Sequence, residues 1–173
     1  GVTLLGLLYI PFLLNFLSRL LFIDSEGAGV VTATGRRLII YLVLVVKMTD
    51  VGAYMAGRFL GSHKLCPKLS PKKTWEGAVG GLLTAVVAGG LFVALGGGAV
   101  GGLRMGLCHA VFLSAGLSVV GQMGDLCESF VKRAADIKDS GGYIPGMGGA
   151  LDVLDSLLFA APALYFYIEF IVR

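Results

Sequence analysis

The sequence is poor in charged residues. Asp, Glu, Lys and Arg make up 14% of its 173 residues, whereas a water-soluble domain carries about a quarter. Hydrophobic residues account for 56%, and the mean hydropathy is +0.85. This balance argues against a soluble globular domain and indicates a membrane protein.

Cysteine pairs and basic arms are missing as well. The three cysteines, Cys66, Cys108 and Cys127, are scattered and form no CxxC pair, so they indicate neither a disulfide framework nor a zinc site. The net charge of +3, without interleaved basic and aromatic residues, gives no support to nucleic-acid binding. The first apolar segment lacks the small-residue cleavage site of a signal peptide.

Long apolar runs are what the chain has instead. A helix needs about 20 apolar residues to cross a membrane, and five segments come close to that length. They lie at residues 2–23, 38–61, 77–98, 103–123 and 152–172. Because the runs are too long for barrel strands, and an open sheet would leave backbone groups unpaired in lipid, helices are expected. The predicted fold is an all-α, polytopic transmembrane bundle of about five spans, forming one membrane domain over the whole chain.

Lysines predict which loops share a side. The loop at 62–77 contains four of them, and the positive-inside rule places such a loop in the cytoplasm. Because the third and fourth spans leave and return, the loop at 124–151 is expected on the same side. Arg36 and Arg37, in the opposite loop, count against this orientation.

Small residues recur every four positions on two predicted spans. They are Ala53, Gly57 and Gly61 on the second, and Gly77, Gly81, Ala85 and Gly89 on the third. Such stripes allow helix backbones to approach closely in lipid. We interpret both stripes as packing surfaces.

Four polar residues share one face of the second predicted span. Lys47, Asp50, Tyr54 and Arg58 follow one another at helical spacing. Charges at membrane depth are unfavourable unless they are paired or hydrated. Either Asp50 is neutralised by Lys47 or Arg58, or this face walls a polar cavity shared with the loops, where Asp50 contributes to substrate binding.

The segment SPKKTWEG, residues 70–77, combines lysines with a predicted helix start. Free N–H groups, the helix dipole and the ammonium groups of Lys72 and Lys73 all favour a phosphate there. Ser70 and Thr74 add hydroxyl donors. The alternative is that the lysines only grip lipid headgroups as a membrane anchor.

Carboxylates are expected at the same membrane face. Asp125 follows Gly124 at the end of the fourth span, and Asp152 and Asp155 lie one turn apart at the start of the last helix. One pair could simply favour the helix dipole, but three converging carboxylates would repel unless a cation joined them. Mg²⁺ binds one or two carboxylates, waters and substrate phosphates. The pattern predicts metal-assisted phosphoryl or nucleotidyl transfer, whereas the charged face from Glu128 to Asp136 is expected to be solvated.

Residues 128–156, ESFVKRAADIKDSGGYIPGMGGALDVLDS, resemble the C-terminal signature of the CDP-diacylglycerol synthases, or phosphatidate cytidylyltransferases. The stretches DVGAYMAGRFLGSHKLCPKLSPKKTWEG and GQMGDLCES are similar to that family too. The residues in register within the signature are Ser129, Lys132, Arg133, Lys138, Asp139, Gly141, Ile144, Pro145, Gly148, Gly149, Asp152 and Asp155. The chain departs from the pattern at Met147 and Gly142, where the family has histidine, and at Val153, where it has arginine.

The resemblance implies that phosphatidic acid attacks the α-phosphate of CTP, giving CDP-diacylglycerol and pyrophosphate in phospholipid biosynthesis. It implies Mg²⁺, with a monovalent cation such as K⁺ sharing the site. The implied roles are metal binding for Asp125 and Asp152 with support from Asp155, phosphate binding for Ser70, Lys72, Lys73 and Thr74, and shaping of the nucleotide end of the pocket by Lys138 and Asp139. It also implies an integral protein of the bacterial cytoplasmic membrane. On this view the chain is the C-terminal part of a longer enzyme without its N-terminal helices, and a homodimer is the assembly to test.

Two other functions are open at this point. One is a different enzyme, either a CTP-dependent lipid-alcohol kinase or an archaeal-type CDP-lipid synthase. The other is a transporter or channel whose path follows the Lys47–Asp50–Arg58 face. Acids and lysines that gather at one membrane face, and do not run through the membrane, disfavour the second.

Overall fold

The structure is a computed structural model that describes residues 2–23, 31–67, 69–100, 103–134 and 150–172. Within these ranges, the side chains of 2–10, 131–134 and 150–155 are not described.

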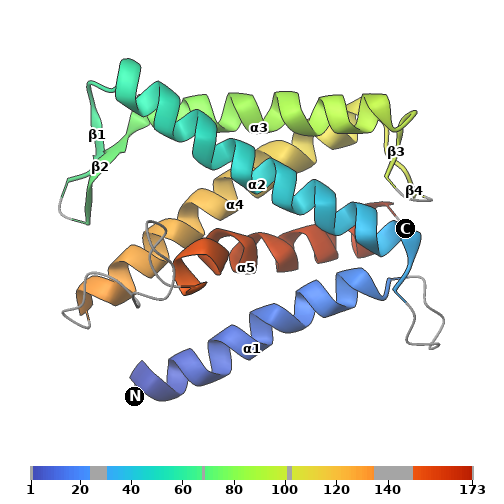
Figure 1. The fold of residues 1–173 in the computed structure, drawn as a ribbon, viewed down its shortest axis with the longest axis horizontal. Coiled ribbons are helices and arrows are strands. Elements are labelled where there is room, and N and C mark those ends of the chain that lie inside the picture. The colour runs from blue at the N-terminus through green and yellow to red at the C-terminus, as the bar shows by residue number, and fades with distance from the viewer. Residues whose placement is uncertain (1, 24–30, 68, 101–102, 135–149, 173) are drawn as a thin grey trace.

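Five α-helices form the described part of the chain (Figure 1). They are α1 (Val2–Leu21), α2 (Ala33–Phe59), α3 (Trp75–Leu95), α4 (Leu107–Ala134) and α5 (Ala150–Tyr167), and α5 continues into a π-helical turn, η1 (Ile168–Val172). Three helical segments are long and apolar enough to cross a membrane, namely α2, α3 and residues Leu107–Phe130 of α4. The expectation of a mostly helical fold is confirmed, and the structure bears out three candidate spans of the predicted five.

Two short antiparallel hairpins interrupt the helices, and the all-α prediction omits them. β1 (Lys64–Cys66) pairs with β2 (Ser70–Thr74) before α3, and β3 (Ala99–Val100) pairs with β4 (Leu103–Arg104) after it. The predicted span at 77–98 therefore ends early, at Leu95. Its last glycines, Gly97 and Gly98, have φ values of 71° and 79°, a left-handed conformation that a helix does not contain.

The glycine stripes pack α2 against α3. A Cβ placed on Gly81 would lie 2.7 Å from the backbone oxygen of Thr49, and one on Gly77 would lie 2.8 Å from that of Ala53. A Cβ on Gly80 would collide with the Cβ of Ala56. The interpretation of both stripes as packing surfaces is confirmed, because the two backbones meet where side chains would not fit.

The hydrophobic core lies where α2, α4 and α5 meet. Its buried residues include Leu38, Tyr41, Leu42, Val45 and Val46 on α2, Ala110, Leu113 and Leu117 on α4, and Ala160, Ala161 and Leu164 on α5. The Tyr41 hydroxyl, buried within it, is 2.8 Å from the hydroxyl of Ser114. The core fixes α4 relative to α2, and this relation positions the site described below.

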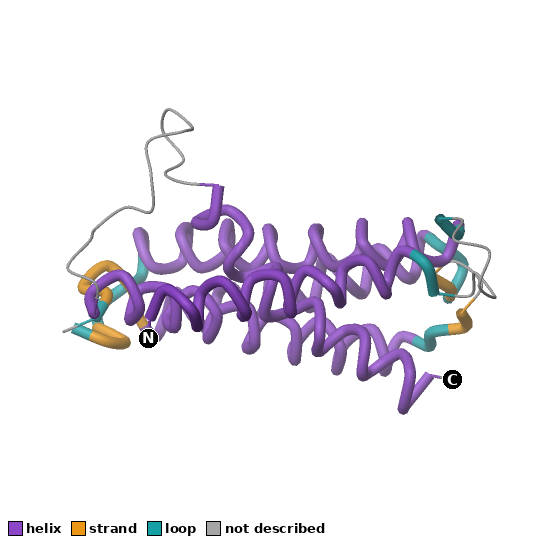
Figure 2. Tube along the Cα trace, turned by 90° about the horizontal axis from the view of Figure 1, so that it is seen from below, coloured by secondary structure: helices purple, strands orange, loops and turns teal. Residues whose placement is uncertain are grey.

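The helices run between two ends of the molecule, with α2 and α4 crossing each other obliquely (Figure 1), and a hairpin lies at each end (Figure 2). The β1–β2 hairpin, the C-terminal end of α4 and the N-terminal end of α5 lie at one end, while β3–β4 and the start of α2 lie at the other (Figure 1). The two loops predicted to share a side therefore do so, as far as the described part of 124–151 extends. Arg36 and Arg37 are at the opposite end.

Candidate active site

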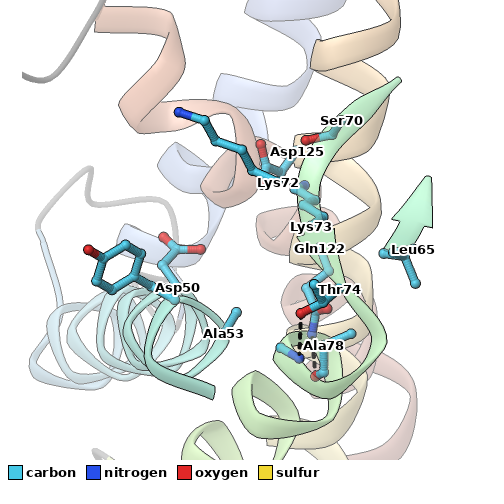
Figure 3. Close-up of a pocket in the computed structure, with 12 residues that line it drawn as sticks. Asp50, Ala53, Leu65, Ser70, Lys72, Lys73, Thr74, Ala78, Gln122 and Asp125 are labelled. Carbon is cyan, nitrogen blue, oxygen red and sulfur yellow. Dashed lines mark hydrogen bonds and ion pairs between the residues drawn. The ribbon is translucent and has the colours of Figure 1, made fainter. Parts of the chain in front are cut away.

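A cavity of about 360 Å³ lies at the β1–β2 end of the molecule. Its walls come from both strands and from α2, α3 and α4. The lining residues are Asp50, Ala53, Tyr54, Leu65, Ser70, Lys72, Lys73, Thr74, Gly77, Ala78, Gln122 and Asp125, and most of them can be followed in Figure 3. The volume falls within the range of about 300–1,000 Å³ typical of small-molecule sites. The structure thus brings together the two segments predicted to form the site, namely the lysine segment and the end of the fourth span.

An ion pair crosses this cavity. The Nζ atom of Lys73, on β2, is 2.5 Å from Oδ2 of Asp125, on α4. The two side chains are 26% and 39% exposed, but the Nζ atom itself is shielded from solvent, and the Asp125 carboxylate is its one polar partner among the described residues. An ammonium group has three N–H donors, and a buried donor without an acceptor is unfavourable. The remaining N–H groups of Lys73 are therefore suited to donate hydrogen bonds to an anionic ligand.

Asp50 forms an ion pair with Lys47 and also lines the cavity. Its Oδ2 atom is 3.5 Å from Nζ of Lys47, and its carboxylate faces the cavity opposite β2 (Figure 3). Both side chains are nearly half exposed, at 43% for Lys47 and 46% for Asp50, and such exposed pairs contribute at most about 1 kcal/mol. The pair with Lys47 is therefore weak, and the Asp50 side chain also forms part of the cavity wall.

Arg58 and Tyr54 interact one turn further along α2. Nη1 of Arg58 donates a hydrogen bond of 2.8 Å to the Tyr54 hydroxyl, and the guanidinium lies 5.9 Å from the centroid of the Tyr54 ring. Because Tyr54 lines the cavity, this contact orients part of the cavity wall. Both alternatives for this face are met in part: Asp50 pairs with Lys47, and Asp50 and Tyr54 line the cavity, whereas Lys47 and Arg58 do not.

Thr74 joins the hairpin to α3. It is the last residue of β2 and also the N-cap of α3, and its Oγ1 accepts a hydrogen bond of 3.1 Å from the backbone N–H of Gly77. Its side chain is buried, although it contributes to the cavity wall. Capping is thus a role of Thr74 that the sequence prediction did not assign, and its hydroxyl can still donate its proton to a ligand.

The base of the hairpin is tied to the first turn of α3. Oε1 of Glu76 lies 2.7 Å from Nδ1 of His63, and each Glu76 carboxylate oxygen accepts a bond of 3.2 Å from the His63 backbone N–H. The Trp75 N–H donates to the His63 carbonyl at 3.0 Å. These contacts close the hairpin where its two strands begin and end.

Comparisons with known proteins agree with this site. The family described as "Cytidylyltransferase family" matches residues 1–171. The chain belongs to the cytidylyltransferase family. The resemblance seen in the sequence is therefore confirmed.

Two relatives of this cytidylyltransferase chain are the following bacterial proteins. It is 46% identical over 162 residues to the phosphatidate cytidylyltransferase of Brucella suis biovar 1 (strain 1330), an alignment that covers 94% of this chain and 55% of that protein. It is 45% identical over 132 residues to that of Bacillus subtilis (strain 168), covering 76% of this chain and 47% of the relative. The chain spans about half the length of the curated relatives it matches.

Gln122 is a cavity residue of this cytidylyltransferase chain that the sequence analysis missed. Its Nε2 atom donates to the carbonyl of Ala78, at 3.3 Å, and to Oγ of Ser118, at 3.2 Å, so it links α4 to α3. The available signal was an amide in an apolar span, one turn before Asp125. The face from Glu128 to Asp136 was expected to be solvated. The side chains from 131 onward on this face are not described, and Glu128 is only partly exposed. Its Oε1 atom is shielded from solvent.

Several predicted site residues of the cytidylyltransferase signature lie outside the described part. Lys138 and Asp139 are among the residues not described, and Asp152 and Asp155 are described only as backbone of α5. Among the described side chains, no group of three His, Cys, Asp or Glu residues could hold a metal ion. The metal site of Asp125, Asp152 and Asp155 stays a prediction.

Proposed function

We propose that this chain carries the active site that transfers CMP from CTP to phosphatidic acid, giving CDP-diacylglycerol and pyrophosphate. The observation that carries the proposal is the shielded Lys73 ammonium, which shares a cavity with Lys72, Asp50 and Asp125. The relatives that match most of the chain are phosphatidate cytidylyltransferases. Anion-binding groups and acidic groups thus share one cavity in a chain of this family.

The chemistry needs no nucleophile from the protein. A phosphate oxygen of phosphatidic acid forms a bond to the α-phosphorus of CTP, while the bond from that phosphorus to the bridging oxygen breaks and pyrophosphate leaves with the electron pair. Lys73 and Lys72 would neutralise the phosphates, and the Ser70 hydroxyl would donate to a phosphate oxygen. Correct positioning and charge neutralisation would supply most of the rate enhancement.

Mg²⁺ suits the acidic side of the cavity. Asp50 and Asp125 supply carboxylate oxygens there, and Mg²⁺ prefers one or two carboxylates together with substrate phosphates. Bound Mg²⁺ supplies charge neutralisation for the phosphate oxygens of CTP. Asp125, already 2.5 Å from an ammonium group, is a described carboxylate in a position to face a cation.

The close approach of α5 to α4 supports Asp152 as a partner of Asp125. A Cβ placed on Gly121 would lie 3.9 Å from the Cβ of Ser156, which makes these residues neighbours across α4 and α5. The two helices run in opposite directions (Figure 1). One turn further along α4 is Asp125, and one turn back along α5 is Asp152. A Cβ on Gly124 would also lie 3.0 Å from the Cβ of Phe159, so α5 passes close to α4 directly before Asp125. This close approach supports Asp152 as a second ligand from the same end of the molecule.

The orientation of the site follows from its lysines. The cavity lies at the end of the membrane-spanning helices where the sequence concentrates lysine, and the positive-inside rule places that end in the cytoplasm. In a bacterium this orientation exposes the cavity to soluble CTP and puts it at the level of the phosphatidic acid headgroup. We therefore assign the chain to the cytoplasmic membrane.

A product assay tests the proposed function. The purified chain is mixed with phosphatidic acid vesicles and CTP labelled on the α-phosphate, with and without Mg²⁺. We expect Mg²⁺-dependent transfer of the label to lipid. Transfer of a γ-phosphate label, with release of CDP, would show a lipid kinase and overturn the proposal. Solute transport through vesicles without turnover of CTP would identify a channel or transporter.

A further inference from the structure

The lysine hairpin, residues 64–74, is held on two sides by different contacts. On the cavity side, Lys73 pairs with Asp125 of α4. At its base, His63 and Glu76 are joined by the hydrogen bonds described above. Neither His63 nor Glu76 lines the cavity, so their contact, which we call the base clamp, lies outside the substrate-binding surface.

The hairpin has little intrinsic stability. β1 has three residues and β2 has five, and the pairing between them is irregular near Lys64 and Cys66. An isolated two-stranded hairpin is at best marginally stable in water. Its position therefore depends on the contacts at its edges.

The inner contact cannot serve as a permanent tether. If the proposed function holds, Lys73 has to turn its N–H groups to a substrate phosphate, and Asp125 has to accept a cation. Both changes weaken the direct ion pair, and each occurs when the hairpin must be held most firmly. The base clamp contains no group of the cavity wall, so it persists through substrate binding.

We propose that His63 and Glu76 are positioning residues that hold the lysine hairpin against the cavity while the Lys73–Asp125 pair is exchanged for substrate and metal. Glu76 carries more of this role, because it accepts bonds from both the ring and the backbone of His63. Loss of the His63 ring leaves the backbone bonds in place. The proposal rests on the proposed function for its link to CTP, but not for its mechanical part.

Cys66 reports on the mechanical part without any substrate. It is a partly buried thiol in β1, opposite Ser70 across the hairpin. Cys108 and Cys127 are exposed, and replacing both by serine leaves Cys66 as the one reactive thiol. Because Cys66 is already partly exposed, the change in its labelling rate between variants, and not the absolute rate, reports on loosening of the hairpin.

Three variants in this background give a graded test. Because hydrogen bonds each change an equilibrium by several-fold, we expect Glu76→Ala to raise the Cys66 labelling rate about tenfold and His63→Ala about threefold. His109→Ala is the matched control, because it removes another 2.7 Å imidazole bond, to the Tyr167 hydroxyl, at the opposite end of the molecule. It should leave the rate unchanged. His63 is 80% exposed, so its replacement tests the clamp even if Glu76→Ala does not fold.

Steady-state kinetics test the link to substrate. We expect Glu76→Ala to raise the KM for CTP about fivefold while kcat changes less than twofold, because positioning is lost but the reacting groups stay. The double variant with His63→Ala should be no worse than Glu76→Ala alone, since both act through one contact. Unchanged labelling in both single variants would overturn the clamp. Faster labelling with an unchanged KM would overturn its link to substrate, whereas absence of CTP turnover in the unmodified chain would contradict only the proposed function.

Discussion

The two ends of the molecule both contain a short antiparallel hairpin, but the two hairpins carry different side chains. A short antiparallel hairpin precedes α3 at one end and follows it at the other. The first hairpin carries Ser70, Lys72 and Lys73 into a cavity, whereas the second begins with two left-handed glycines and carries Arg104 as its charged residue. The presence of a hairpin beside α3 therefore does not by itself determine function. What distinguishes the active end is that α4 and α2 bring carboxylates to face the first hairpin.

Loss of Asp125 should have the largest effect on activity, and it tests the difference between the two ends most strongly. Asp125→Asn removes the counter-charge of Lys73 and a proposed metal ligand, and we expect CTP turnover to fall by about a thousandfold or more. Asp152→Asn should abolish Mg²⁺-dependent turnover in the same way. Circular dichroism checks that both variants stay helical. Glu169→Gln in η1, at the other end, is the control, and a comparable loss there would refute the distinction between the ends.

Loss of Lys73 should have the next largest effect. Lys73→Met keeps the length of the side chain but removes the ammonium group, and we expect kcat/KM for CTP to fall about a hundredfold. Arg104→Met removes a basic residue from the other hairpin. If both variants lost activity equally, general surface charge and not the cavity would be responsible.

The close packing of α2 against α3 can be tested by stability measurements, without an activity assay. Gly80→Val would drive a side chain into Ala56, and we expect a loss of about 2 kcal/mol in the free energy of unfolding. Gly116→Ala is the control, because a Cβ at Gly116 meets nothing within 4 Å. Thermal unfolding in detergent measures both, and equal midpoints would contradict the close approach of the two helices.

The smallest effect is expected at the second hairpin. Gly97 has a φ of 71° with open space around it, so Gly97→Ala carries only the backbone penalty of about 1 kcal/mol. CTP turnover should not change. A loss of activity would show that the two ends are coupled more strongly than their separation suggests.

The sequence predicts the helices well because their signal is local. Long apolar runs and small residues at four-residue spacing depend only on neighbours in the chain. The predicted segments are mostly helical in the described part of the chain, although three of the five are long and apolar enough there to cross a membrane. The hairpin of residues 64–74 has no such signal, since its strands are short and rich in lysine. Its structure depends on Glu76, thirteen residues away from His63, and on the start of α3.

The sequence predicts which residues belong to the candidate site, but it does not predict which of their side chains contact one another. Charge and spacing indicate that Lys73 and Asp125 face the same end, and the cavity confirms this. That the two form a direct ion pair depends on how far α4 reaches past the hairpin, which is a property of the packed bundle. Gln122 was missed for the same reason, because its role arises only from contact with Ala78 on α3.

Thr74 ends β2 and caps α3 in the same residue. No linker separates the strand that bears the lysines from the helix that crosses the lipid. A bilayer that is thinner or thicker than the hydrophobic length of α3 changes the tilt of that helix, and the strand must then tilt with it. We therefore expect membrane thickness to influence the position of Lys73, so that acyl-chain length would affect the proposed reaction even where no acyl chain touches the reacting atoms.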